Sequence, residues 1–232
     1  MSRLDDAAQI DITAFGQVEN RHSAPVGWYF REPTSKADAL DLVMGGILGW
    51  WKIRPDGRLA IGYVGSPVLG SSLSLNFKDE GMGKPRLVAT APPRAGTHVS
   101  WKTNTAPQGR SEIADSVDDE TAAILGQEAR YAQALSPHVA MLYPTAKIVF
   151  VANSGFWNEV DAETETARQQ GILEIERNRW EWEMMIDPFI DLTGIVATIN
   201  NVNRLGFGAS KPLLSASIDT QGTSQVTLGW WG

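Results

Sequence analysis

Glu181 and Glu183 form the acidic pair in this sequence that could most readily do acid–base chemistry. They are two residues apart in an alternating run, so on a strand both side chains would lie on one face. A retaining glycosidase needs two carboxyl groups about 5 Å apart that flank the scissile bond, and these usually come from different strands. The pattern therefore favours a solvated strand face over a catalytic pair.

Metal-binding and phosphate-binding patterns are weak. His22, His98 and His138 are far apart in the sequence and lack ligand spacing, so a zinc site would require the fold to bring two of them together with carboxylates. The Gly-Met-Gly-Lys-Pro segment at 81–85 lacks the first glycine of a phosphate loop, and Pro85 replaces the hydroxyl residue that binds magnesium. A turn is the expected structure there.

The remaining acidic candidate is the pair Asp187 and Asp191, which flanks Pro188. A turn is the simplest interpretation, with a calcium loop as the alternative. The sequence also lacks the G-x-S-x-G and G-x-G-x-x-G motifs. We predict no catalytic, cofactor-binding or metal-binding residue, no cofactor and no enzymatic activity.

Tryptophans are the other distinctive residues, with nine in 232 positions. Trp50-Trp51 and Trp230-Trp231 are adjacent pairs, so on a strand each pair places one ring on either side. Large aromatic rings concentrate in cores and interfaces. Core or interface packing is therefore expected, and stacking on sugar rings is the alternative.

Composition limits the class of protein. The fractions of hydrophobic (43%) and charged (20%) residues are those of a globular chain. The net charge of −7 argues against general nucleic-acid binding. No apolar run is long enough for a membrane span, and the N-terminus lacks the pattern of a signal peptide. The absence of cysteine suits assembly in a reducing cytoplasm.

The clearest local structure is a helix followed by a β-hairpin over residues 35–62. Ser35 and Asp38 resemble a capping box, and Gly49 is the expected C-terminal cap. Gly45 and Gly46 inside the helix imply close approach of another backbone. Residues 54–57, Arg-Pro-Asp-Gly, are typical of a tight turn between two strands.

Further patterns predict an α+β fold: the helix-hairpin unit, a central mixed region, and a C-terminal antiparallel sheet or small barrel. Helices are expected over 116–135 and 161–176. The domain boundary is placed at residue 110, which gives an N-terminal unit over 1–110 and a C-terminal unit over 111–232. Strands are expected at 26–30, 50–53, 58–61, 73–77, 86–91, 98–103, 147–152, 179–186, 195–199, 213–218 and 225–230.

Three stretches of the sequence resemble the C-terminal part of the tail-tip or baseplate hub proteins (minor tail proteins) of tailed phages, prophages and gene-transfer-agent-like particles. The first stretch is similar to the family's helix, G-W-W and x-D-x-x-G-R-L/F unit. The second is similar to its D-L-G-D-x-V strand entry, from which this chain departs at Thr193. The third is similar to its R-x-G-L/F…K…V-x-L-x-x-W-G finish. The matching residues are 26–29, 39–41, 49–51 and 56–59, then 179–186 and 190–196, then 203–208, Lys211 and 226–232.

The resemblance implies a structural virion protein that joins the tail tube to tip and host-contact proteins. It implies a homotrimer at the distal tip of the tail, made in the bacterial host cytoplasm, with distal tail, tip and fibre proteins as partners. No nucleic-acid contact and no membrane span are expected. The alternative is a carbohydrate- or receptor-binding module at the tail tip. The predicted interface residues are Trp50, Trp51, Arg204, Phe207 and Trp231.

Overall fold

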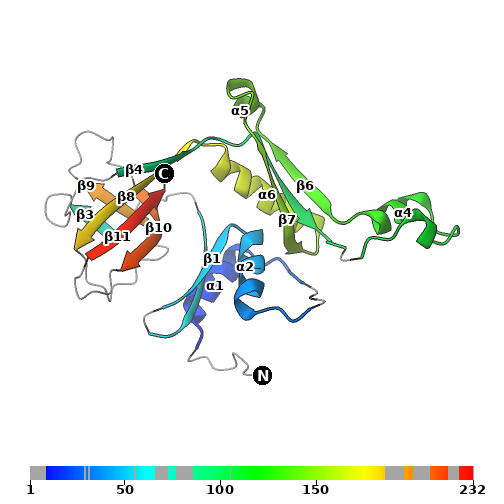
Figure 1. The fold of residues 1–232 in the computed structure, drawn as a ribbon, viewed down its shortest axis with the longest axis horizontal. Helices are drawn as coiled ribbons and strands as arrows, with labels where there is room; N and C mark the ends of the chain where they lie inside the picture. The colour runs from blue at the N-terminus through cyan, green and yellow to red at the C-terminus, as the bar shows by residue number, and fades with distance from the viewer. Residues whose placement is uncertain are drawn as a thin grey trace. The chain divides into compact units, whose positions relative to one another are not determined.

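The computed structural model describes residues 9–28, 30, 32–54, 56–65, 73–76, 86–104, 106–185, 196–200, 210–218 and 225–231 (Figure 1). The chain divides into two compact units built from interleaved segments. The first unit contains Met1–Ile12, Lys52–Pro93 and Ile175–Gly232, and the second contains Thr13–Trp51 and Arg94–Glu174. Whether 1–110 and 111–232 fold independently stays a prediction.

A six-stranded sheet forms most of the first unit. Its strands, in spatial order, are β3 (Leu73–Asn76), β9 (Val196–Asn200), β10 (Ser210–Ile218), β11 (Gln225–Trp231), β8 (Arg177–Met185) and β4 (Arg86–Ala91). All neighbours are antiparallel except β3 and β9, which are parallel. The α+β class is confirmed. Among the described strands the sheet is open, with β3 and β4 at its edges, so the alternative of a small barrel is wrong.

The predicted hairpin is confirmed as β1 (Gly49–Ile53) and β2 (Leu59–Tyr63). Gly57 has a φ of 83°, a left-handed conformation that glycine adopts without steric cost, and its N–H donates to the Arg54 carbonyl at 2.9 Å. Asp11, just before α1 (Ile12–Arg21), contacts both the strand β2 and the turn of this hairpin. Its N–H donates to the Leu59 carbonyl at 2.9 Å, and its buried carboxylate meets the Arg54 guanidinium at 2.6 Å.

The second unit is built on a three-stranded sheet. Its order is β6 (Arg130–Leu135), β5 (Gly96–Trp101) and β7 (Ile148–Phe156), with β6 antiparallel and β7 parallel to β5. Helix α6 (Glu159–Leu173) packs against β5 and β6 (Figure 1). The Thr97 hydroxyl donates to the Gln170 side-chain oxygen at 2.9 Å, which shows that α6 covers the face bearing Thr97 and Val99. Val99 is fully buried there.

Helix α2 (Lys36–Gly46) begins as its sequence predicts. The Ser35 side chain accepts a hydrogen bond from the Asp38 N–H, as in a helix N-cap. The expected backbone approach exists at Gly46, which lies against Ser154, but space around Gly45 is open within 4 Å. Gly49 as the C-terminal cap is wrong. The chain turns one residue earlier, at Leu48 with φ 46°, because Gly49 already begins β1.

The expected helix over 116–135 is wrong in its second half. Helix α4 spans only Asp119–Gly126, capped by Asp118, whose side chain accepts from the Thr121 N–H. Residues 130–135 form β6, because pairing along β5 overrides a weak helical pattern. At the described positions 26–28 and 30, where a strand was expected, only an isolated bridge between Val26 and Phe156 forms. Helices that the sequence did not predict are α1 (Ile12–Arg21), α5 (Pro137–Leu142) and the short 3₁₀ helix η1 (Arg110–Glu112).

Candidate functional site

The predicted interface residues are only partly described. Trp50 and Trp51 are half-buried in β1, and the Trp51 indole N–H donates to the Asp41 carboxylate of α2 at 2.7 Å. Trp231 is the last residue of β11, with its backbone opposite Arg179, and its side chain lies outside the described residues. Arg204 and Phe207 also lie outside them. Their role in an interface therefore stays a prediction.

Glu181 is engaged in ion pairs. Its carboxylate lies 3.1 Å from the Arg86 guanidinium on the neighbouring strand β4 and 3.5 Å from that of Arg179 on its own strand. Partly exposed pairs of this kind contribute little to stability. The Glu183 side chain and residues 81–85 and 187–191, where turns were expected, lie outside the described residues.

The three histidines have separate surroundings. His22 follows α1 and lies near Glu165, His98 stacks edge-on against Phe150 at 4.7 Å between ring centroids, and His138 is exposed on α5. Burial lowers the pKa of both His22 and His98 below its ordinary value. Among the described residues, histidines and carboxylates nowhere gather in a group of three that could hold a metal ion.

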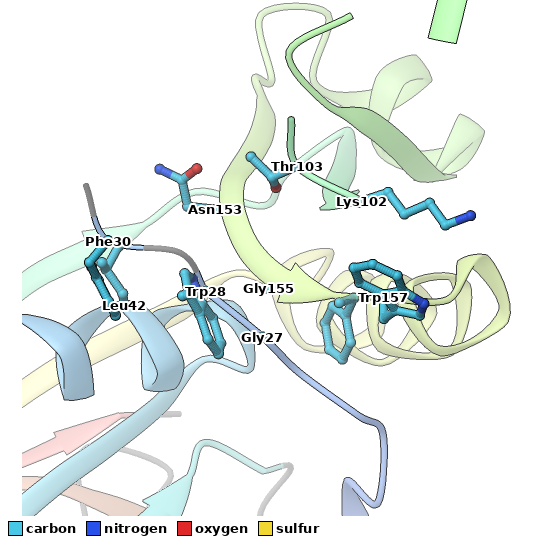
Figure 2. A pocket seen from close by; sticks show the side chains of 10 residues that line it. Gly27, Trp28, Phe30, Leu42, Lys102, Thr103, Asn153, Gly155 and Trp157 are labelled. Carbon is cyan, nitrogen blue, oxygen red and sulfur yellow. The ribbon is translucent and has the colours of Figure 1, made fainter. Parts of the chain in front are cut away.

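The second unit contains a hollow, the aromatic pocket, with a volume of about 450 Å³. In the view of Figure 2, Trp28 lies between Phe30 on one side and Trp157 on the other. Phe30 is 41% exposed and Trp157 63% exposed, so both rings stand at the opening. The residues that give the pocket its character are Trp28, Phe30, Lys102, Thr103, Asn153 and Trp157.

Gly155 makes room for the Trp28 ring at this pocket. It has a φ of 72°, and a Cβ on it would lie 2.2 Å from a carbon of the Trp28 ring. The indole therefore occupies the space that a side chain at residue 155 would take. The N–H of Gly27 donates to the Gly155 carbonyl at 2.9 Å, and Val26 bridges Phe156. These backbone contacts position Trp28 at the end of β7.

Polar groups also line the pocket. Lys102 has a φ of 46°, its N–H donates to the Phe156 carbonyl at 2.9 Å, and its ammonium lies 5.6 Å from the centre of the Trp101 ring. The Thr103 hydroxyl and the Trp28 indole N–H are buried, and neither has a hydrogen-bond partner among the described residues. The pocket thus combines exposed rings with buried hydrogen-bonding groups that lack a partner among the described residues.

Sequence reasoning missed most of this pocket. Trp28 belongs to one of the stretches that carried the family resemblance, but Thr103, Asn153 and Trp157 stood in no recognised motif. The available signal was Gly155-Phe156-Trp157, a glycine and two rings directly before the α6 start. This run of residues predicts a pocket only weakly unless Trp28 and Gly155 are known to be neighbours in the fold.

In the described part of the chain, the face of the three-stranded sheet opposite α6 carries a group of exposed apolar side chains; we call it the open sheet face. Leu135 (59% exposed) and Ile148 extend over Gly96, where a Cβ would lie 2.6 Å from Leu135 Cδ2. Phe150 (60% exposed) contacts His98 and, edge-on, Tyr131 at 5.9 Å between ring centroids. The exposed apolar residues of this face are Tyr131, Leu135, Ile148 and Phe150. Clustered exposed apolar residues mark interaction surfaces.

A buried polar cluster joins α6 to α2 behind that sheet. The Glu165 carboxylate, 3% exposed, accepts hydrogen bonds from Arg168 at 2.6 Å and Gln169 at 2.7 Å, and lies 3.4 Å from His22 Nδ1. Arg168 also donates to the Ile47 carbonyl, and Gln169 to the Gly46 carbonyl. These donors satisfy the last carbonyls of α2, which has no basic residue of its own in its last turn.

None of the helices in the described part of the chain is long and apolar enough to cross a membrane.

Comparison with known proteins gives a likeness of fold. No family model matches the sequence, and no curated protein matches it. The fold is similar to the crystal structure of the tail protein from Neisseria meningitidis MC58, with a TM-score of 0.50 and 11% identity over 89% of this chain. The 43 kDa tail protein of prophage MuSo2 from Shewanella oneidensis has a TM-score of 0.45 and 10% identity over 88% of this chain. The chain spans 57% and 54% of the lengths of these two proteins.

Proposed function

We propose that this chain is a structural component of a phage-type tail, specifically a tail-tip or baseplate hub subunit that joins the tail tube to tip and host-contact proteins. The observation that carries the proposal is the likeness in fold to the Neisseria tail protein across 89% of the chain. The three sequence stretches that resemble hub proteins point the same way. The proposal includes a homotrimer and no catalytic role.

The open sheet face supports a role in assembly. In the described part of the chain, one face of the three-stranded sheet packs on α6, and the other exposes apolar side chains that a partner would remove from water. The Phe150 ring extends from the edge strand β7 over that face, because it contacts both His98 of β5 and Tyr131 of β6. A subunit that buries this face against its neighbours would gain the stability that such burial gives.

The test is complementation of a gene deletion in the host of the particle. Deletion is expected to leave particles without completed tails, and the unchanged gene to restore them. Phe150→Glu would place a charge on the open sheet face and is expected to fail, whereas Val160→Glu adds the same charge at an exposed position on α6 and is expected to succeed. Normal tails from the deletion strain would overturn the structural role, and normal assembly with Phe150→Glu would overturn the use of this face.

The alternative, a carbohydrate- or receptor-binding module at the tail tip, is favoured by one observation, the aromatic pocket. Both functions can belong to one chain, because the pocket lining and the open sheet face share no residue.

A further inference from the structure

We propose that the aromatic pocket binds one pyranose ring of a glycan. The inference rests on the second of the two functions above and is independent of tail assembly. It places the site at Trp28, Thr103, Asn153 and Trp157, and not at the adjacent tryptophan pairs that the sequence suggested.

The exposed rings suit the apolar face of a sugar. Trp157 is 63% exposed and Phe30 41% exposed, although each directly adjoins the pocket. A pyranose ring has a face of C–H groups that can cover an aromatic ring and an edge of hydroxyls that stays polar. The volume of about 450 Å³ falls within the range of about 300–1,000 Å³ of small-molecule pockets.

The polar groups of the pocket suit the hydroxyl edge. The Trp28 indole N–H can only donate, whereas the Thr103 hydroxyl can donate and accept. Both atoms are buried without a partner among the described residues, and an unsatisfied buried group costs about 1–3 kcal/mol, so a shift of the neighbouring side chains that lets a sugar hydroxyl reach them would be favoured. The Asn153 amide, exposed at the same pocket, offers donors and an acceptor together. Neighbouring sugar hydroxyls present the same mixture of donors and acceptors.

Charge disfavours polyanionic ligands. Lys102 is the one basic residue lining the pocket in the described part of the chain, and its ammonium lies over the Trp101 ring. The protein as a whole carries a net charge of −7. A nucleotide or phosphorylated ligand would need several basic groups or a helix N-terminus without acidic residues, whereas the first turn of α6, after Trp157, carries Glu159 and Asp161. A sugar needs neither.

The test is calorimetric titration of the full chain with glucose, galactose, N-acetylglucosamine and their β-linked disaccharides, together with a printed glycan array. Trp157→Ala is expected to weaken binding at least tenfold, and Thr103→Val, which keeps the shape and removes the hydroxyl, several-fold. Tyr143→Ala removes an exposed ring on the segment after α5 and is expected to leave affinity unchanged. Circular dichroism of each variant checks that it folds.

Two results would overturn the inference: no glycan bound at millimolar concentration by the folded protein, or binding that Trp157→Ala and Thr103→Val both leave unchanged. In the first case, apolar peptides that bind the folded protein and lose binding with Trp157→Ala would assign the pocket to a protein partner. Particles carrying Trp157→Ala are expected to assemble normally, so a failure of sugar binding is distinguishable from a failure of the tail role.

Discussion

Gly46 of α2 lies directly against the backbone of Ser154 in β7, so closely that a Cβ on residue 46 would stand 2.5 Å from the Ser154 carbonyl oxygen. Ser154 is itself fixed, because its N–H donates to the Ser100 hydroxyl and its own hydroxyl donates to the Ser100 carbonyl. The helix and the sheet therefore meet through backbone, with no room for a side chain at residue 46.

Gly46→Ala is expected to lower the free energy of unfolding by about 1–3 kcal/mol, the usual cost of an overpacked contact. The measurement is chemical denaturation followed by circular dichroism. Gly45→Ala is the matched control, since its surroundings are open within 4 Å, and the gain in helix propensity is expected to stabilise by up to about 1 kcal/mol. Equal effects from the two substitutions would contradict the contact.

Glu165→Ala is expected to destabilise the second unit by about 3 kcal/mol. The substitution leaves Arg168 and Gln169 without the carboxylate that accepts from both, and truncation of one partner in a buried ionic group is costly. Glu163→Ala removes an exposed carboxylate two residues earlier on the same helix and is expected to have a small effect. Thermal unfolding of the two variants side by side measures the difference. Similar melting temperatures would argue against the buried cluster.

Stability is expected to fall as the pH is lowered from 7 towards 5. Burial lowers the pKa of His22 and His98 in the folded state below the ordinary value of 6.5, so in this range the unfolded chain binds more protons than the folded one. The stabilisation is present above the unfolded pKa and is lost as the pH falls through the folded pKa. His98→Gln is expected to reduce the slope of unfolding free energy against pH. An unchanged slope would show that His98 protonates equally in both states.

Gly155→Ala is expected to disturb the aromatic pocket as well as stability. The left-handed φ alone costs about 1–2 kcal/mol for a residue with a Cβ, and the added methyl group would displace the Trp28 ring. The near-ultraviolet circular dichroism of the tryptophans is expected to change with it. Gly171→Ala, in α6 with open space around it, serves as control and is expected to stabilise slightly. A native aromatic spectrum for Gly155→Ala would place Trp28 elsewhere.

Local signals predicted the elements that depend on local chemistry. Ser35 with Asp38 identified the start of α2, and Gly57 identified the hairpin turn. Residues 130–135 were assigned to a helix because their strand pairing is set by β5, some 35 positions away. The aromatic pocket was hidden for the same reason. Trp28 and Gly155 are neighbours only in the folded chain, and neither residue in the sequence predicts contact with the other.

Immunogold electron microscopy of tailed particles, with antibody against this chain, tests the central claim most directly. If the chain is a hub subunit, the label is expected only at the distal end of the tail, at the tip or baseplate. Particles that stay unlabelled at the tail, both intact and after mild disruption that exposes the epitope, would contradict a structural role in the tail.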